Sequence, residues 1–407
     1  MTSIPAHLGE LLARLRYRRG LSLSELASAT YVSRSWISNV EAGRRWPTRD
    51  WLLEAERLLD AVGQLVPTWE QVQRERTSDA EVRQLVAESV HESELLLAAQ
   101  PDAVDLDRLS ESTADLAVAY LSNPARPMLE QASALRRELG RRLVAGAVRP
   151  GQLSDLYVAL GRVHGVLAYA ALDLGIPSAA AKHGQTVWRM GDLSADNNLR
   201  AWARGTQSLI ARFEHRYVEA LAYINDGLPC AGVGTSEIRL LCGAAQCAAN
   251  MGDGAAAVAY LDRARRARQD AKPDPVAGLF AFSPAKQAYY SASSLMWLTD
   301  RRALEAAERN ATTAIELWQH EPPEQRSLDD EALAHVYLAT ARLKLDQVEG
   351  AMDAVKPIMA LPEERQISWI RNRISELGDL LDGKRFRNAK TAIVARDELR
   401  TFRRPDG

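Results

Sequence analysis

The sequence predicts an all-α protein with a small helical domain at its N-terminus and an α-superhelix of repeated helix pairs behind it. Two observations carry this prediction. Short segments near the N-terminus begin at capping residues and continue with apolar residues at helical spacing. From about residue 105 the composition turns to Ala, Leu and Arg, with almost no strand signal. We therefore expect an N-terminal domain over residues 1–76, a helical linker over 77–104 and a repeat domain over 105–407.

The N-terminal domain should contain four or five short helices around one core. The first has an apolar stripe at the i, i+3, i+4, i+7 spacing of an amphipathic helix, formed by Leu8, Leu11, Leu12 and Leu15. Ser22 and Glu25 form the pattern of a capping box, which predicts a helix over about 23–30. Ser33 is a second N-cap, and Thr48 is a third.

Positive charge is concentrated in this domain. Between Arg14 and Arg49 the chain has eight arginines and only two acids, a local balance of +6. Residues 1–76 together carry +2 and the whole chain carries −2, so the remainder carries −4. This distribution is expected of a domain that binds duplex DNA and of a larger domain that does not.

Residues 8–60 resemble the phage-repressor helix-turn-helix family (XRE, Cro/C1-type). The residues that carry the resemblance are Gly20, Leu21, Ser22, Glu25, Leu26, Ala27, Val32, Ser33, Arg34, Ser35, Ile37, Ser38, Glu41, Gly43, Arg44, Arg45 and Pro47. The sequence departs from the family at two positions. Leu23 stands where a phosphate-contacting Gln is usual, and Tyr31 stands in the turn where Gly is usual.

The resemblance implies that the helix starting near Ser33 enters the major groove of a double-stranded DNA operator. The residues implied to read bases are Arg34, Ser35, Ser38 and Asn39, and those implied to hold phosphates are Ser22, Arg44, Arg45 and Thr48. Trp36 and Trp46 have two interpretations, because each could wedge against the sugar-phosphate backbone or cover the core.

The rest of the chain contains an internal repeat. Five segments share an apolar helix with small residues, a tight polar turn and a second helix that opens on Ala, with turn centres near Gly175, His215, Gly252, Thr299 and Asp346. These segments resemble tetratricopeptide repeats with insertions. The resemblance implies a superhelix with a concave groove lined by the first helix of each pair. The residues this nominates for the groove are His164, Trp202, Arg204, Gln207, Gln246, Tyr289 and Tyr290.

Three segments have open roles. The linker helix is a spacer or a dimerisation helix. Residues 270–283 form an apolar insertion with Pro273, Pro275, Phe280 and Phe282, and could cap the groove or mediate self-association. The basic tail from Lys384 to Arg404 is a solvated capping helix or a second DNA contact.

Motifs of enzymes are missing from the sequence. It has no GxxxxGK(S/T), GxGxxG, HExxH or GxSxG motif, and its seven histidines lack ligand spacing. Its three cysteines have no CxxC spacing. We therefore expect no catalysis, no cofactor and no metal. The lack of a long apolar run and of a signal peptide predicts a cytoplasmic protein without membrane contact, associated with the nucleoid when it binds DNA.

The sequence thus favours a DNA-binding transcriptional regulator that forms a homodimer and senses a peptide, small molecule or protein in the repeat groove. The layout resembles the peptide-pheromone-sensing regulators (the Rap, Rgg, NprR, PlcR and PrgX group) and actinobacterial regulators of similar build. The alternative is a repeat-based interaction scaffold or antagonist whose N-terminal domain serves for localisation. The sequence does not give the operator, the ligand or the choice between repressor and activator.

Overall fold

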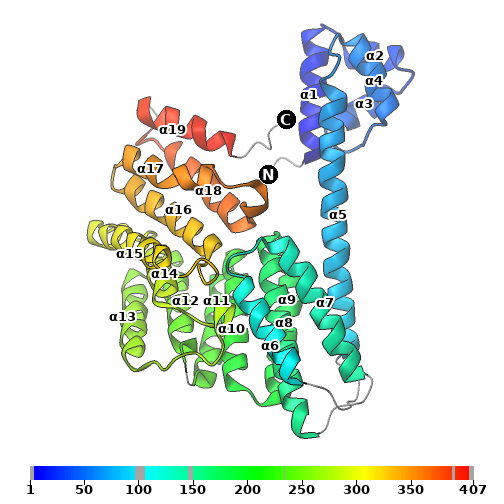
Figure 1. The fold of residues 1–407 in the computed structure, drawn as a ribbon. Coiled ribbons are helices and arrows are strands. Elements are labelled where there is room, and N and C mark those ends of the chain that lie inside the picture. Colours follow the sequence, from blue (N-terminus) through cyan, green and yellow to red (C-terminus); the bar gives the residue numbers. More distant parts are fainter. Residues whose placement is uncertain (1–3, 97–105, 145–149, 233, 387–389, 403–407) are drawn as a thin grey trace. The chain divides into compact units, whose positions relative to one another are not determined.

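A computed structural model describes residues 4–96, 106–144, 150–232, 234–386 and 390–402, and its regular structure there is entirely helical (Figure 1). The predicted all-α fold is therefore confirmed for this part of the chain. The described residues divide into two compact units, one up to Gln84 and the other from Leu85. Residues 97–104 of the predicted linker lie outside the described residues. Of the helices described, none is both long enough and apolar enough to cross a membrane.

The first unit packs short helices around a single apolar core. Its helices are α1 (Ile4–Arg18), α2 (Leu23–Ala29), α3 (Arg34–Glu41), α4 (Arg49–Leu58) and the first part of α5 (Leu65–Leu96). The predicted stripe residues Leu8, Leu12 and Leu15 are buried in this core, and so are Ile37 and Val40 of α3.

All three predicted N-caps are present. The Ser22 N–H donates to Glu25 Oε2 at 2.7 Å and the Glu25 N–H donates to Ser22 Oγ at 3.2 Å, which is a complete capping box. Ser33 accepts from the Trp36 N–H at 3.1 Å, and Thr48 accepts from the Trp51 N–H at 3.3 Å. These bonds fix where α2, α3 and α4 begin.

Two further residues set the path of the chain in this unit. A Cβ on Gly9 would lie 2.3 Å from the carbonyl oxygen of Glu41, so only glycine lets α1 pass this close to the end of α3. The buried carboxylate of Glu56 accepts from the N–H groups of Leu65 at 2.5 Å and Val66 at 2.8 Å. Glu56 thereby satisfies donors at the start of α5 that would otherwise lack a partner.

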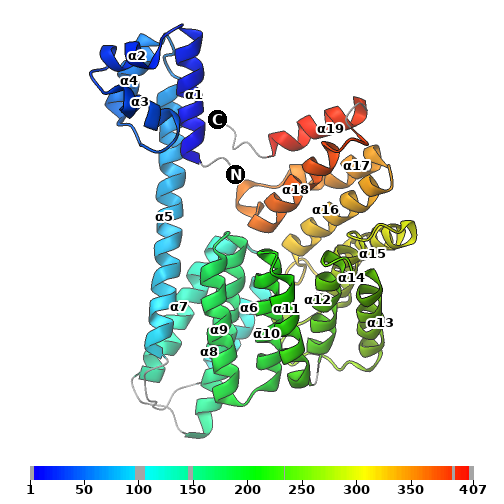
Figure 2. The same ribbon diagram turned by 180° about the vertical axis from the view of Figure 1, so that it is seen from behind.

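The second unit is an array of helix pairs. In chain order its helices after α5 are α6 (Leu106–Ala119), α7 (Ala125–Val144), α8 (Leu153–Asp173), α9 (Pro177–Ser194), α10 (Asn197–Phe213), α11 (Tyr217–Gly227), α12 (Ser236–Asn250), α13 (Gly254–Asp270), α14 (Pro284–Leu295), α15 (Arg301–Gln319), α16 (Leu328–Lys344), α17 (Val348–Met359), α18 (Ser368–Leu381) and α19 (Lys390–Thr401). Short 3-10 turns occupy Pro150–Gln152, Leu228–Cys230, Gly278–Phe280 and Glu363–Arg365. Both views show consecutive helices side by side (Figures 1 and 2).

Each of the five predicted turn centres lies between the two helices of one pair, from α8 and α9 to α16 and α17. Four of the five adopt a left-handed backbone, with φ of 79° at Gly175, 59° at His215, 84° at Gly252 and 69° at Asp346. A left-handed residue just after a helix is a common way to end it. The repeated pattern in the sequence therefore corresponds to one repeated turn geometry.

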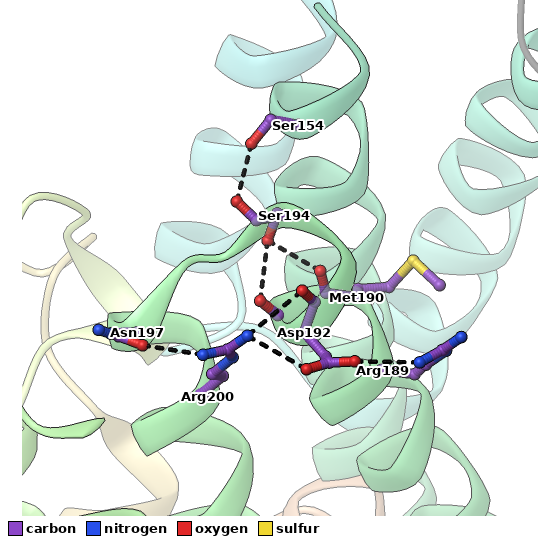
Figure 3. A network of polar contacts seen from close by, with 8 residues as sticks. Ser154, Arg189, Met190, Asp192, Ser194, Asn197 and Arg200 are labelled. Carbon is purple, nitrogen blue, oxygen red and sulfur yellow. Dashed lines mark hydrogen bonds and ion pairs between the residues drawn. The ribbon is translucent and has the colours of Figure 1, made fainter. Parts of the chain in front are cut away.

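The junction between one pair and the next is held by side chains (Figure 3). Arg200, near the start of α10, donates to Asp192 Oδ1 at 3.1 Å and to Asn197 Oδ1 at 3.1 Å. The Ser154 hydroxyl at the start of α8 donates to the Ser194 carbonyl at 3.0 Å. These bonds tie the end of α9 to both the preceding and the following helix.

The two ends of the array are hydrogen-bonded to each other. The Leu328 N–H, at the start of α16, donates to the Leu121 carbonyl after α6 at 3.0 Å. The Ser368 hydroxyl of α18 donates to the Leu172 carbonyl of α8 at 2.7 Å. Arg365 donates to the Ser122 carbonyl and lies 3.5 Å from Asp329. The superhelix therefore closes on itself.

The insertion at residues 270–283 packs inside the array. Asp274 accepts from the N–H and the hydroxyl of Thr235 at 2.8 and 2.7 Å. A Cβ on Gly278, whose φ is 71°, would lie 2.3 Å from the Ala117 carbonyl of α6. This placement favours the capping role over self-association, because Phe282 is buried and Phe280 half-buried within this chain, although Pro273 and Pro275 are exposed.

The basic tail ends in a helix that packs on its own repeat unit. Ala392, Ala395 and Leu399 of α19 are buried against the core of the last pairs. This agrees with the capping helix expected for the tail. Arg387, Arg403 and Arg404 lie outside the described residues.

Closure of the array has a pH-dependent element at Asp329. Burial raises the pKa of this carboxyl to about 6, although Arg365 opposes the shift. The folded protein therefore holds the Asp329 proton more tightly than the unfolded chain, and ionisation costs stability as the pH rises from about 4 to above 6. We expect Asp329→Asn to gain about 2–3 kcal/mol relative to the parent protein over this range.

Urea unfolding of both proteins at several pH values measures this difference. Asp270→Asn is the control, because Asp270 is exposed at the end of α13. A difference between Asp329→Asn and the parent that stays constant with pH would contradict the prediction.

Candidate nucleic-acid interface and repeat-domain cavity

The α3 helix presents the four residues nominated for base reading in two groups. Arg34 and Ser35 are exposed in its first turn, while Ser38 and Asn39 are half-buried in the next. Ser35 and Ser33 share a hydrogen bond at 2.9 Å between their hydroxyls. Arg34 has the most freedom to reach a base edge, because it is a long, exposed side chain at the front of the helix.

Asn39 already has a partner in the unbound protein. Its Oδ1 accepts from Arg44 Nε at 3.0 Å, and its backbone carbonyl accepts from the N–H groups of Arg44 and Arg45. The side-chain bond links a nominated base reader to a nominated phosphate contact. To pair with a base through Oδ1, Asn39 would have to give up this bond or share it.

The four residues nominated for phosphate contact are all exposed. The hydroxyls of Ser22 and Thr48 accept capping bonds, and each keeps a proton that can be donated to a phosphate oxygen. The guanidinium of Arg45 lies over the ring of Trp36, 5.7 Å from its centroid. These helix starts and cations are groups that commonly bind phosphates.

One arginine of the basic segment is not available to DNA. Arg16 is 3% exposed, and its guanidinium makes two bonds to the carboxylate of Glu41, at 2.6 and 2.8 Å. It also donates to the Leu21 carbonyl at 2.8 Å. The pair ties α1 to the end of α3. The ion pair takes one positive and one negative charge out of the count. The remaining charges between Arg14 and Arg49 therefore still sum to +6.

Trp36 and Trp46 both pack against other rings of the unit. The Trp36 ring lies 4.6 Å from that of Trp51, and the Trp46 ring stacks on Trp69 at 6.1 Å. Trp69 Nε1 also donates to the Pro47 carbonyl at 3.0 Å. These contacts support the core-covering interpretation of both residues.

The second unit encloses a cavity at the centre of its closed array. The cavity contains about 1030 Å³ of space free of protein atoms, part of it open to solvent. Its walls come mainly from the first helices of the pairs, as expected for the groove. Aromatic and ionisable lining residues are Tyr120, Tyr169, Asp173, Arg212, Tyr217, Arg239, Phe282, Lys286, Tyr289, Tyr290, Trp297, Asp329, Asp330, Tyr337, Trp369 and Arg373.

The structure brings three of the seven nominated groove residues to this cavity, namely Gln246, Tyr289 and Tyr290. It places the other four elsewhere. His164 is fully buried against His183, with 3.0 Å between their Nδ1 atoms. The Trp202 ring lies tilted against that of Phe280, with 4.6 Å between centroids, and lines a separate cavity.

Arg204 and Gln207 form a local cluster outside the central cavity. The guanidinium of Arg204 lies 3.6 Å from the centroid of Trp188, pairs with Asp226 at 2.5 Å and donates to Gln207 Oε1 at 2.8 Å. These residues share α10 with the cavity residue Arg212 but face another direction. Membership of a first helix therefore does not by itself place a side chain in the cavity.

Sequence reasoning missed most ionisable groups of the cavity. Arg212, Arg239, Lys286 and Arg373 are its cations, and Asp173 is its most buried acid. On α12, cavity residues recur at positions 239, 246 and 250, a helical spacing that marks one face. This spacing was the available signal, but using it requires knowing which face of the helix turns inward.

Burial shifts the ionisation of these groups. It raises the pKa of Asp173 well above its ordinary value, and the Tyr120 hydroxyl donates to this carboxyl at 2.5 Å. Burial lowers the pKa of Lys286. The described residues bring together no group of three or more His, Cys, Asp or Glu side chains that could hold a metal ion.

Comparison with known proteins agrees with the geometry of the first unit. Residues 7–69 match the family described as Helix-turn-helix domain. A domain of this kind indicates DNA binding. No curated protein matches the chain. Among solved structures, the crystal structure of the yeast Tom70 aligns over 98% of this chain and 83% of its own, with 12% identity and a TM-score of 0.39.

The turn of the helix-turn-helix domain holds a bulky residue in a glycine-like conformation. Tyr31 has a φ of 55° and is 96% exposed, so its ring gains little from packing. A left-handed conformation costs an L-residue about 1–2 kcal/mol. Tyr31→Gly removes this cost from the folded state, but glycine also makes the unfolded chain more flexible, which offsets part of the gain. We therefore expect the substitution to stabilise the domain by about 0.5–1 kcal/mol.

Hydrogen exchange of the buried backbone amides of α1 to α4 at increasing denaturant concentration measures the change for this unit alone. Tyr31→Ala is the matched control, because it removes the ring and keeps the Cβ that causes the strain. Equal stabilities of the Gly and Ala variants would show that backbone strain at this turn is not the cause.

Proposed function

We propose that this protein is a sequence-specific DNA-binding transcriptional regulator whose repeat domain senses a ligand. The single observation that carries the proposal is the exposed, capped α3 helix with Arg34 at its front, within a domain that matches the helix-turn-helix family. The +6 balance around α3 supplies the sequence-independent part of the affinity. We further propose that the domain is of the XRE (Cro/C1) type.

The regulator acts as a homodimer in this proposal. Helix-turn-helix dimers bind half-sites about one helical turn apart, so two domains must reach adjacent major grooves at once. A ligand that changes the repeat domain or its dimer changes the spacing of the two domains and hence operator affinity. The protein works in the cytoplasm and is nucleoid-associated when it binds DNA.

The enclosed cavity supports a sensing role for the repeat domain. A concave site with aromatic walls and a few polar groups is typical of ligand pockets. The ligand is a peptide, a small molecule or part of a protein. Catalysis is not proposed, because the nominated residues supply no nucleophile with an adjacent base and orienting group.

Arg34 provides the direct test of DNA reading. An arginine at the front of a recognition helix most often pairs with guanine O6 and N7, which is worth about 1–3 kcal/mol of discrimination. We expect Arg34→Ala to weaken binding to the operator by about 5- to 150-fold. Binding to unrelated duplex should fall much less. Fluorescence anisotropy with operator fragments, selected from genomic DNA by the parent protein, measures both.

Two variants sharpen this test. Arg44→Ala removes a nominated phosphate contact, so it should weaken operator and unrelated DNA by similar factors and reduce the salt dependence of binding. Arg265→Ala is the control, because this arginine is exposed on α13 in the other unit. If the parent protein binds no duplex at low salt, or Arg34→Ala binds the operator like the parent, the proposed function is wrong.

A further inference from the structure

The central cavity holds more cations than its own acids neutralise. Arg212, Arg239 and Lys286 line it and form no ion pair with any described residue, whereas Arg373 pairs with Glu376 at 2.5 Å. Of the lining acids, Asp329 faces Arg365 at 3.5 Å. Asp330 attracts Lys286, whereas no described carboxylate pairs with Arg212 or Arg239.

Arg212 is the least compensated of these cations. It is 6% exposed, and its Nε has no hydrogen-bond partner within the described structure. The groups that face its guanidinium are Tyr290, Tyr169 and Cys247, none of which is an acid of ordinary strength. A buried charge of this kind costs several kcal/mol unless something pairs with it.

The other two cations differ from Arg212 in their contacts. Arg239 donates to the Trp202 carbonyl at 2.8 Å and to the hydroxyls of Tyr169 and Thr206, each at 2.9 Å. Neutral oxygens thus satisfy its hydrogen bonds but not its charge. The contact of Lys286 is a long one, 3.4 Å from Nζ to the Ala281 carbonyl. Both Arg239 and Lys286 add to the positive electrostatic potential at Arg212, and neither shares a hydrogen-bond acceptor with it.

The acids of the cavity do not restore the balance. Burial is the first cause of the raised pKa of Asp173, and the carboxyl is engaged by Tyr120. Asp173 therefore stays protonated to a higher pH than an exposed aspartic acid, which keeps its negative charge low. Asp330 accepts from the Ser327 hydroxyl at 2.7 Å, and it is a single carboxylate against the three cations Arg212, Arg239 and Lys286. The cavity keeps a positive surplus.

The walls around these cations are aromatic. Tyr289 stacks on Tyr337 with 5.2 Å between ring centroids and meets Tyr290 edge-on at 5.3 Å. Trp297 and Trp369 lie on the same cavity. Rings of this kind stack on flat apolar groups and leave tyrosine hydroxyls to hydrogen-bond a polar end.

We propose that the cavity binds an anionic ligand with a planar apolar body, whose carboxylate or phosphate group pairs with Arg212. Guanidinium binds both anions through two parallel hydrogen bonds, which suits Arg212, because its Nε lacks a partner and its side-chain hydrogen bond goes to Tyr290 and not to a carboxylate. The apolar body lies against the tyrosine and tryptophan rings. This inference rests on the sensing role proposed above and specifies the chemistry of that same site.

The test is a thermal-unfolding titration of the full chain with pairs of probes that differ only in charge. One pair is 4-hydroxyphenylacetate and its amide, and the other is the N-acetylated peptide Gly-Gly-Tyr and its C-terminal amide, so that in each pair one member is an anion and the other is neutral. Phenyl phosphate tests whether a phosphate group can replace the carboxylate. Inorganic phosphate, which has no ring, shows how much the ring contributes. At up to about 10 mM, which detects even weak complexes, we expect an anionic aromatic probe to raise the melting temperature and its neutral partner to have little effect.

The two pairs also distinguish the sources of the carboxylate. A response to the free aromatic acid alone indicates a small metabolite, and a stronger response to the peptide acid indicates a peptide C-terminus. If no anionic probe stabilises the protein, or amides stabilise it as well as acids, the proposal is wrong.

Variants of Arg212 separate a ligand contact from a structural role. Arg212→Gln should weaken binding of the effective probe by about 10- to 100-fold, because it removes a charged hydrogen-bond donor. Arg212→Met should leave the ligand-free protein at least as stable as the parent, since it removes an unpaired buried charge. Arg189→Gln, which changes an exposed arginine of α9, is the control and should bind normally.

Two results would overturn the assignment of Arg212. One is equal probe affinity in Arg212→Gln and the parent, and the other is a large loss of stability in ligand-free Arg212→Met. DNA binding, measured on the same samples, keeps this inference apart from the proposed function. If the protein binds the operator but no anionic probe, only the ligand proposal is wrong. If it binds an anionic probe but no operator, only the proposed regulator function is wrong.

Discussion

Closure of the helix array is the constraint on which the repeat unit depends. An open superhelix presents a groove, but here the Leu328 N–H bonds to the Leu121 carbonyl and Ser368 bonds to the Leu172 carbonyl. Segments more than 190 residues apart thereby become neighbours. The first helices of the pairs then face a shared interior, where electrostatic interactions are stronger than at an open surface.

The insertion at 270–283 completes this interior. Its conformation depends on Asp274, whose carboxylate takes two donors from Thr235, and on Gly278, which passes too close to α6 for any side chain. Without this segment the inner faces of α6 and α14 would expose apolar surface. A loop of this length is therefore a structural part of the cavity and not a loose connection between pairs.

The sequence predicted those parts of the fold that depend on local interactions. Ser22, Ser33 and Thr48 bond to N–H groups three residues ahead, so the residue type and a short spacing suffice to place each helix start. The turn centres of the repeats are equally local. At Gly175 and Gly252 the residue itself permits the left-handed backbone that the turn needs.

Features that depend on distant contacts could not be predicted in this way. In the sequence, nothing distinguishes Arg16 from the arginines around it. Only the packing of α1 against α3 shows that it pairs with Glu41. Arg204 and Arg212 lie two turns apart on α10, yet one binds Asp226 and the other faces the cavity. Which face of a helix turns inward is set by the neighbouring pairs, so helix membership could nominate groove residues but not choose among them.

The same geometry determines how a bound anion would act on the protein. Arg212 belongs to α10, Lys286 to α14 and Arg373 to α18, so a ligand in the cavity contacts helices from separate pairs. Such a ligand binds the closed array more tightly than any opened form, in which these helices separate. Its binding free energy then favours closure, and the shift is limited to the difference in its affinity for the two forms. Because the cations of the cavity repel one another, an anion between them also reduces a force that opposes closure. A ligand of the proposed chemistry is thus coupled to the shape of the array through the same residues that bind it.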